Sequence, residues 1–591
     1  KVPFVVSFAS MVDETAERAH LVLPDHTPLE SWGDLVPRDG VRCLIQPTIR
    51  PLWDTRALGD TLLDTARAMG EEVASKLPSG SFRTLLEEAW SGTDLTAALA
   101  RGGEFSRPAP ATGPVALVEG AGRLEVVEPV FSGEGEFVLL PFPHSFLYDG
   151  RGANLPWLQE IPDPVVSVTW EPWAEVSLAT AERLDLELGD VVAIETSAGR
   201  IEVSVHPRGG IRDDVVAVPI GQGHSVGRYA SRAGDGRVGE ARGANVIELL
   251  PAGVDESGGQ AWLTEKARLH KTGRYQRLPL LQFSDNKRGR QLGEAIALAD
   301  LAAAGHGEQE SHAQNGHHGS HEIREAFQAS ADAAEGGLYR WGMTVDLDRC
   351  TGCAACVAAC YLENNVPVVG EEEILRVRPM SWIRIERYIG DGEAELVAGR
   401  KHPARNREEL GGVDVRHSPM LCQQCGAAPC EPVCPVYATY HNEEGLNGMV
   451  YNRCIGTRYC AANCPYKVRR FNFFDNALTK WPDPMRLGLN PDVTVRAQGV
   501  MEKCTFCIQR IQAARQVAKD QGRSIGDGEI VTACQQACPT RAIQFGNLLD
   551  PNSLVVQQGS EPKRAYHALH MLNTRPAVTY LAKVLREPAE G

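Results

Sequence analysis

Fifteen of the sixteen cysteines in this chain lie between residues 350 and 538, in four groups with regular spacing. The first group has the pattern C-x2-C-x2-C-x3-C and the second has C-x2-C-x4-C-x3-C. In the third, Thr457 stands where the second cysteine is expected, and in the fourth a 26-residue insert separates two pairs. The groups are Cys350, Cys353, Cys356 and Cys360; Cys422, Cys425, Cys430 and Cys434; Cys454, Cys460 and Cys464; and Cys504, Cys507, Cys534 and Cys538.

This spacing is typical of cysteines that bind iron–sulfur clusters. A C-x2-C-x2-C loop binds three irons of one cluster, while a fourth cysteine, followed by proline, binds a different cluster. Proline follows the last cysteine of three groups, whereas Tyr361 follows Cys360. Three [4Fe-4S] clusters need twelve thiolates and one [3Fe-4S] cluster needs three, which matches the fifteen cysteines. Because a hydroxyl is a poor iron ligand, we expect Thr457 to leave one corner of one cluster empty.

Other uses of clustered cysteines fit less well. Zinc ribbons contain C-x2-C pairs, but zinc takes four ligands and does not use triplets that end in C-x3-C-P. Disulfide frameworks are typical of small secreted domains rather than of 591 residues. Thr457 leaves one alternative open, a four-iron site whose fourth corner is completed by water or another side chain. Cys43, outside the groups, is interpreted as a small buried hydrophobe rather than a metal ligand.

The segments that flank the cysteines indicate how they are positioned. We expect "YRWGMTVDLDRC" to form a strand that leads into the first group, and "GMVYNRC" one that leads into the third. "RAIQFGNL" is expected to form a returning strand after the last cysteine. Strand, cluster loop, helix and strand in repetition is the layout of a two-cluster ferredoxin. Residues 336–591 are therefore predicted to be a four-cluster ferredoxin-like domain made of two α+β modules, one nested inside the other.

Nesting pairs the two outer cysteine groups with each other and the two inner groups with each other. In each pair, the cysteine that ends one group is expected to bind the cluster of the other group. No catalytic residue is predicted. The sets predicted to hold [4Fe-4S] clusters are Cys350, Cys353, Cys356 and Cys538; Cys504, Cys507, Cys534 and Cys360; and Cys422, Cys425, Cys430 and Cys464, while Cys454, Cys460 and Cys434 are predicted to hold the [3Fe-4S] cluster.

A basic run, "YKVRRFNFF", follows Cys464 directly. Its cations, Lys467, Arg469 and Arg470, are candidates for stabilising a reduced cluster or for docking a partner. The sequence leaves open the alternative of a solvated face whose phenylalanines, at 471, 473 and 474, lie in the core.

Size and charge limit the function classes. With 591 residues the chain is long enough for several domains. A net charge of −16 argues against nucleic acid as a partner, because phosphate binding needs a basic face. No run of 18 apolar residues occurs, so we expect membrane contact to come through partner subunits. The chain opens at Lys1 in a segment that reads as the middle of a fold, from which we expect an upstream portion.

The residues before 336 divide into three parts by composition. Residues 1–135 combine short apolar strands with helical patterning, which indicates an α/β region. Residues 136–252 carry apolar runs such as 165–170 and 215–219 and predict a β-barrel. Residues 253–335 are rich in Gly, Ala and polar residues and predict a linker. Its histidines are interpreted as part of a solvated tether, with adventitious metal binding as the alternative: His306, His312, His317, His318 and His321.

Two stretches of the N-terminal half resemble molybdopterin oxidoreductases. Residues 13–34, "DETAERAHLVLPDHTPLESWGD", are similar to a segment of that family that reads loosely "TETA..AD.VLP...LE..G". Residues 184–205 and 215–224, "LDLELGDVVAIETSAGRIEVSV" and "VVAVPIGQGH", resemble its C-terminal six-stranded, double-psi-type barrel, which in that family covers one end of the pterin cofactor. We expect a structural barrel without molybdopterin here, and no molybdenum ligand is assigned.

The cysteine region resembles the four-cluster electron-transfer subunits of the DMSO and polysulfide reductase families. The segment "CIGTRYCAANCPYKVRRFNF", with Thr457 in place, and the order of the domains are more similar to the iron–sulfur subunit of alternative complex III, a bacterial quinol oxidoreductase. That subunit fuses a molybdopterin-type domain without cofactor to a domain with three [4Fe-4S] clusters and one [3Fe-4S] cluster.

This resemblance implies partners and a location. The implied partners are a polytopic membrane subunit that binds quinol, and multihaem and monohaem cytochrome c subunits. The chain has no C-x2-C-H motif, so we expect it to attach no c-type haem itself. The implied location is peripheral, at the periplasmic face of a membrane. The leading hypothesis is an electron-transfer subunit of a quinol oxidoreductase complex with no bond-making chemistry of its own. The alternatives are a molybdenum-dependent oxidoreductase fused to its electron-transfer part, and an N-terminal half that serves only as a platform for assembly.

Overall fold

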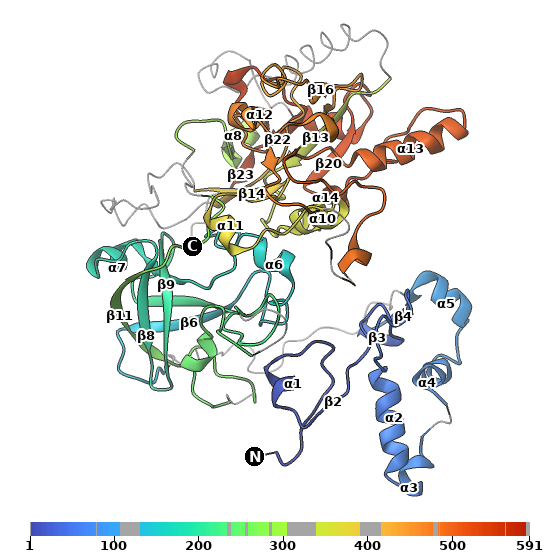
Figure 1. The fold of residues 1–591 in the computed structure, drawn as a ribbon, viewed down its shortest axis with the longest axis vertical. Coiled ribbons are helices and arrows are strands. Elements are labelled where there is room, and N and C mark those ends of the chain that lie inside the picture. The colour runs from blue at the N-terminus through green and yellow to red at the C-terminus, as the bar shows by residue number, and fades with distance from the viewer. Residues whose placement is uncertain are drawn as a thin grey trace. The chain divides into compact units, whose positions relative to one another are not determined.

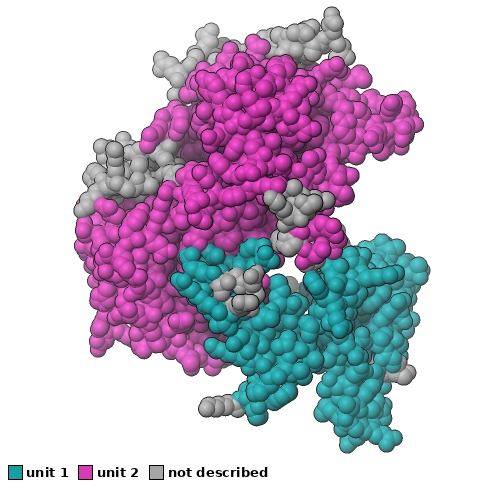
Figure 2. All heavy atoms as spheres, in the orientation of Figure 1, with its two compact units in different colours: residues 1–130, 224–242 teal, residues 131–223, 243–591 magenta. Residues whose placement is uncertain are grey.

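The structure is a computed structural model, and it describes residues 2–586 apart from 78–79, 107–129, 233–237, 255–257, 283–286, 304–337, 390–414, 477–480, 482, 484 and 562. The five histidines of the expected tether lie outside the described residues. The chain forms two compact units, one made of residues 1–130 and 224–242 and the other of residues 131–223 and 243–591 (Figure 2).

The first unit contains small sheets and short helices. Three of its five described helices begin at a side-chain cap, as where Asp13 accepts a hydrogen bond from the backbone N–H of Ala16. A small core forms around Leu44, Trp90 and Ala98. The elements are β1 (Val6–Ser7) and β2 (Leu21–Val22), which pair in parallel; β3 (Gly33–Arg38), β4 (Val41–Ile45) and β5 (Gly103–Phe105); and α1 (Glu14–Arg18), α2 (Leu58–Ala68), α3 (Glu71–Ala74), α4 (Phe82–Ala89) and α5 (Leu95–Arg101).

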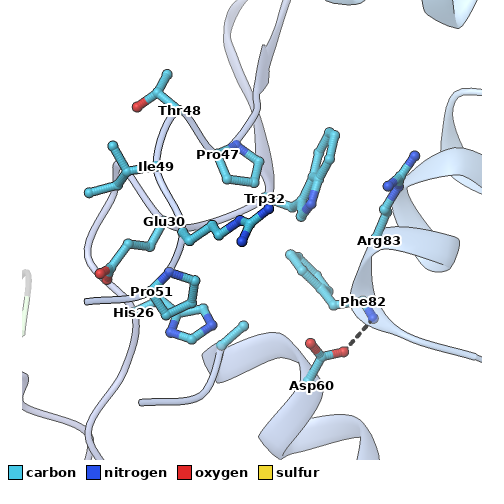
Figure 3. Close-up of a pocket in the computed structure, with 12 residues that line it drawn as sticks. His26, Glu30, Trp32, Pro47, Thr48, Ile49, Pro51, Asp60, Phe82 and Arg83 are labelled. Carbon is cyan, nitrogen blue, oxygen red and sulfur yellow. Dashed lines mark hydrogen bonds between the residues drawn. The ribbon is translucent and has the colours of Figure 1, made fainter. Parts of the chain in front are cut away.

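Cys43 lies on β4 as a free thiol that is only partly buried, so the structure places it less deeply than the sequence predicts. A pocket in the same unit is lined by Trp32, Phe82 and Arg83, with the Arg83 guanidinium carbon 4.7 Å from the centroid of the Trp32 ring (Figure 3). Both carboxylates of this pocket have partners: Asp60 accepts a hydrogen bond from the backbone N–H of Phe82, and Glu30 accepts one from that of Leu52.

A closed six-stranded barrel begins the second unit (Figure 1). Apolar side chains that alternate along each strand point inward and form its core, among them Leu139, Ile194 and Val218. The order around the barrel is β10-β6-β11-β8-β9-β7, with β6 (Phe137–Pro143), β7 (Ala174–Ser177), β8 (Asp190–Glu195), β9 (Arg200–Arg208), β10 (Val215–Ile220) and β11 (Lys266–Tyr275).

Two predictions for this region need correction. The sixth barrel strand, β11, lies within residues 253–335, which the sequence predicts to be a linker. Its exposed side chains are mostly polar, so that its apolar signal is weak. The run 165–170, predicted to be a strand, holds only an isolated bridge between Val168 and Leu280 and packs in a separate small cluster.

The cysteine-bearing part of the second unit is built on a four-stranded sheet in the order β20-β13-β22-β21. β13 precedes the first cysteine group and pairs antiparallel with β20, which follows the last. Short hairpins and helices complete this part (Figure 1). The sheet strands are β13 (Trp341–Asp346), β20 (Ile543–Asn547), β21 (Ala565–Tyr566) and β22 (Val578–Leu581); the paired short strands are β12 (Ala295–Ala297) with β23 (Lys583–Leu585), β14 (Arg384–Ile389) with β15 (Val415–Met420), β16 (Thr439–His441) with β17 (Asn447–Met449), and β18 (Arg470–Phe471) with β19 (Met501–Glu502); and the helices are α8 (Leu298–Ala303), α10 (Ala355–Glu363), α11 (Glu371–Leu375), α12 (Tyr459–Asn463), α13 (Ile508–Asp520), α14 (Ala533–Gln536) and α15 (Leu554–Gly559).

A buried glutamate joins the barrel side of this unit to the first cysteine group. Glu160 ends α6 (Pro156–Glu160) and is 1% exposed. Its carboxylate accepts hydrogen bonds from the Tyr361 hydroxyl, at 3.0 Å, and from the backbone N–H groups of Val369 and Gly370, both at 2.8 Å. Tyr361 is the residue that replaces the expected proline after Cys360, so the departure from the motif has a structural role: it lets α10 continue and anchors this contact.

Burial raises the pKa of Glu160 from 4.5 to about 7, although its hydrogen bonds oppose the shift. A carboxyl with a raised pKa in the folded state stabilises the fold at low pH, and this contribution is lost as pH rises. We expect the free energy of unfolding to fall by about 3 kcal/mol between pH 4.5 and 7 from this group alone. Glu160→Gln should remove this fall in denaturation curves recorded across that range, whereas the exposed Glu182→Gln should retain it. An unaltered pH dependence in Glu160→Gln would contradict the assignment.

Candidate iron–sulfur cluster sites

The loop of the first cysteine group is formed by backbone conformations that favour small residues. After β13, Gly352 has φ of +73°, and a Cβ there would lie 2.5 Å from Cδ2 of His417, so that glycine is required on both counts. Ala354 has φ of +53° and serves as the N-cap of α10. The left-handed turn directs the chain from the loop into the helix, with Cys356 and Cys360 on α10.

The third group repeats this loop residue by residue. Gly456 has φ of +73°, as Gly352 does, and Arg458 caps α12 with φ of 62° and ψ of 4°, close to the 53° and 13° of Ala354. Both helices begin at the next residue. Thr457 therefore occupies the position that corresponds to Cys353 in a loop of the same shape.

The structure brings the thiols into four neighbourhoods. Burial raises the pKa of Cys350 to about 11, and the nearby thiols of Cys538 and Cys353 add to the shift. The pKa of Cys356 is raised well above its usual value by burial and by the thiols of Cys534, Cys350, Cys353 and Cys538. The first of these neighbourhoods thus holds the thiols of Cys350, Cys353, Cys356 and Cys538.

The second neighbourhood surrounds Cys360 on α10. Burial raises the pKa of this thiol well above its usual value, and the thiols of Cys504, Cys507 and Cys534 add to the effect. Cys534 faces both this neighbourhood and Cys356 of the first, which is consistent with the close packing of α10 and α14.

The third and fourth neighbourhoods surround two cavities. Burial raises the pKa of Cys430 to about 11, and the thiols of Cys422 and Cys464 contribute. Burial also raises the pKa of Cys460, with contributions from the thiols of Cys454 and Cys434. One cavity is lined by Cys422, Cys425, Cys430 and Cys464, and the other by Cys434, Cys454, Thr457 and Cys460.

Hydrogen bonds to sulfur surround the thiols. Backbone N–H groups four residues further on donate to Cys434 and Cys538, from Ala438 and Ala542, each at 3.2 Å. The side-chain amide of Asn364 donates to the sulfur of Cys360 at 3.5 Å. Hydrogen bonds of this kind to cluster ligands adjust reduction potentials.

These residues fit iron–sulfur clusters by the chemistry of their donors. The described part of the chain shows no three Cys, His, Asp or Glu side chains that converge on a single-ion site. Cluster ligands bind separate irons and therefore surround a volume rather than a point. A second observation agrees: the buried Arg469 lines both thiol-lined cavities, and its Nε has no hydrogen-bond partner among the described residues, a donor that an anionic sulfur could satisfy.

In the basic run "YKVRRFNFF", one cation lies beside the thiols and another lies on the solvated surface, so each of the two interpretations from the sequence holds for part of the run. Arg469 is buried beside the thiols, whereas Lys467 is exposed and its Nζ donates to the backbone oxygen of Ala462. Phe474 is 50% exposed, so it does not belong to the core. Sequence reasoning missed Asn364, whose amide contacts the Cys360 sulfur from one helical turn further on, and Asn447, whose Oδ1 accepts a hydrogen bond from Arg469 22 residues away.

In the described residues, no helix has both the length and the apolar character needed to cross a bilayer.

Three family models match parts of the chain. A 4Fe-4S dicluster domain matches residues 349–438, and a second 4Fe-4S dicluster domain matches residues 413–481. A molydopterin dinucleotide binding domain matches residues 162–263, which include four strands of the barrel described above but not β6 or β11.

Relatives match part of this chain over most of their own length. The iron–sulfur cluster-binding subunit of menaquinone reductase from Nitratidesulfovibrio vulgaris is 42% identical over 248 residues, which are 41% of this chain and 89% of that one. An Hdr-like menaquinol oxidoreductase iron–sulfur subunit from Archaeoglobus fulgidus is 37% identical, over 36% of this chain and 73% of that one. Among solved structures, acetylene hydratase from Pelobacter acetylenicus has a TM-score of 0.37 at 16% identity, over 46% of this chain and 40% of that chain, which is too loose to support an argument.

Proposed function

The chain belongs to the family of iron–sulfur cluster-binding subunits that includes the menaquinone reductase subunit of N. vulgaris, and from this premise we propose that it carries electrons within a membrane-bound quinol oxidoreductase complex. The observation that supports this function most strongly is that thiols from separate cysteine groups come together within one compact unit. The two matches to 4Fe-4S dicluster domains also support multiple 4Fe-4S clusters in this chain.

The cluster assignment proposed here follows the four neighbourhoods. Bound clusters supply one-electron carriers. The proposed [4Fe-4S] ligands are Cys350, Cys353, Cys356 and Cys538; Cys360, Cys504, Cys507 and Cys534; and Cys422, Cys425, Cys430 and Cys464, and the proposed [3Fe-4S] ligands are Cys434, Cys454 and Cys460. The loop equivalence of Thr457 and Cys353 supports the smaller cluster, and the pairing of β13 with β20 supports nested modules.

The chain's own residues have three tasks in this proposal. The thiols bind iron, the apolar core that contains most of them excludes water, and hydrogen bonds to sulfur adjust the potentials. Exposed apolar side chains flank the three-thiol set, with Tyr437 63%, Ile455 65% and Tyr459 57% exposed. We propose this rim as the place where electrons enter from a membrane partner.

The finer identity that we propose is the iron–sulfur subunit of an alternative complex III type of assembly. The supporting features are a match to a molydopterin dinucleotide binding domain and two matches to 4Fe-4S dicluster domains in one chain. This identity implies a polytopic quinol-binding subunit, cytochrome c subunits and attachment at the periplasmic face. The proposed domains are an α/β region over 1–135, a barrel that starts at 136 and includes β11, and the four-cluster domain over 336–591.

The test uses the membrane complex that contains the full chain, purified without oxygen through a tag on this chain. A reduced menaquinone analogue should bleach the visible absorbance of the clusters, and c-type haem should copurify. Cys460→Ser should abolish the quinol-driven bleaching, while Cys43→Ser, which lies outside the thiol sets, should preserve it. Clusters that dithionite reduces and quinol does not would contradict the function, and absence of haem would contradict only the finer identity.

The second candidate is a molybdenum enzyme fused to its electron-transfer part. The match of residues 162–263 to the molydopterin dinucleotide binding domain favours it. Metal analysis of the full-length protein separates the two candidates, because about one molybdenum or tungsten per chain is expected only for the second.

A further inference from the structure

Arg469 is a buried cation whose partners include sulfur. It is 5% exposed. Its Nη1 donates to the sulfur of Cys430 and to Oδ1 of Asn447, each at 3.1 Å, and its Nη2 donates to the thioether of Met449 at 3.4 Å. Within the described residues no carboxylate pairs with it, and its Nε has no hydrogen-bond partner.

The position of Arg469 is shared between two thiol sets. The side chain lines both the cavity of Cys422, Cys425, Cys430 and Cys464 and the cavity of Cys434, Cys454 and Cys460. Burial alone would lower the pKa of Arg469, but the thiols of Cys430 and Cys460 on either side raise it above its usual value.

A buried charge without an opposite charge is unfavourable. Arg469 has no carboxylate partner, so its compensation must come from the anionic groups of the two sites. The guanidinium of Arg469 in turn stabilises negative charge on the clusters, including the electron that each cluster gains on reduction. Net charge and hydrogen bonds to sulfur are two of the factors that set cluster potentials.

We propose that Arg469 raises the reduction potentials of both neighbouring clusters, through its charge at the three-thiol site and through its charge and its hydrogen bond to Cys430 at the four-thiol site. This inference rests on the proposed function, because it requires clusters in both sites. One residue of the basic run, Arg469, would thus adjust the reduction potentials of two adjacent clusters.

Of the neighbouring cations, Lys467 supplies the matched control. Lys467, two residues earlier, is exposed and donates to a backbone oxygen. Arg470 donates from Nε to the backbone oxygen of Ser381, but its charge also acts on the thiol of Cys464, so it is left unaltered. Lys503, which is 1% exposed, donates to the backbone oxygen of Cys504 and stays in place in every variant.

The experiment is a redox titration of the complex, followed by EPR, with iron content measured on each sample. Arg469→Gln should shift the reduction equilibrium of both clusters at least tenfold towards the oxidised form, about 59 mV for one electron. Arg469→Lys keeps the charge but loses the planar fork, so the shift should persist at the four-thiol cluster and be small at the three-thiol cluster. Lys467→Gln should leave both potentials unchanged.

Unchanged potentials in Arg469→Gln with full iron content would overturn the proposal. If that variant loses iron, Arg469→Lys decides, and unchanged potentials there also overturn it. Loss of iron from both variants would contradict it as well, since Arg469 would then build the sites rather than adjust them. Absence of clusters from the unaltered complex would instead refute the proposed function.

Discussion

Replacement of Thr457 by cysteine is expected to raise the iron content of the chain by about one atom and to abolish the EPR signal of an oxidised three-iron cluster. The loop around Thr457 has the backbone shape of the loop around Cys353, including the left-handed residue before each helix. A cysteine at this position would therefore present its sulfur as Cys353 does. A fourth thiolate completes the ligand set of a four-iron cluster, so the cluster should change type without a change in the fold.

Thr457→Ser is the matched control, because it keeps a hydroxyl and removes only a methyl group. It should retain both the three-iron signal and the iron content of the unaltered chain. If Thr457→Cys kept the three-iron signal with no added iron, the lack of a thiol at position 457 would not be the reason that the fourth iron is missing. If the unaltered chain already held four irons there, the open alternative of a completed four-iron site would be correct.

Replacement of Glu502 by glutamine is expected to lower the free energy of unfolding by about 3–5 kcal/mol, the usual effect of removing one partner of a buried ion pair. The carboxylate of Glu502 lies 2.7 Å from Nη2 of Arg496, and both side chains are 1% exposed. It also accepts hydrogen bonds from Nε1 of Trp382, at 3.0 Å, and from the amide of Asn472. Glutamine keeps the shape and leaves the Arg496 charge without compensation.

The loss of stability should affect the cluster sites, because Glu502 lies on β19, two residues before Cys504. Thermal unfolding followed by visible absorbance and circular dichroism should show a Tm lower by roughly 10 °C. The exposed pair of Arg523 and Glu529 is the control, since Arg523→Gln should change stability by less than about 1 kcal/mol. The double variant Arg496→Met/Glu502→Leu should recover part of the loss, and an equal or larger loss would contradict the explanation by an unpaired charge.

The shape of the cysteine loops can be read from the sequence because it depends on residues that are close in the chain. The spacing of each group and the glycines at 352 and 456 determine the loops with little help from the rest of the fold. The barrel strands that alternate clearly are also found, whereas β11, with its polar exposed face, is not.

Contacts between distant residues could not be predicted in the same way. Glu160 meets Tyr361 across 201 residues, and the bond between Arg469 and Cys430 spans 39. In the sequence Tyr361 is only a departure from the expected proline, and Arg469 is one of three cations within four residues. Which cation is buried depends on the alternation of side chains before β18 and on the thiols that the fold brings together.

The central claim is that the fifteen thiols hold three four-iron clusters and one three-iron cluster. The most direct test is the iron and sulfide content of the unaltered complex per chain, together with the EPR spectrum of the oxidised sample. The account predicts about 15 irons and about 16 sulfides attributable to this chain, with the signal of one oxidised three-iron cluster. About 16 irons without that signal, or a subunit free of iron when prepared without oxygen, would contradict it.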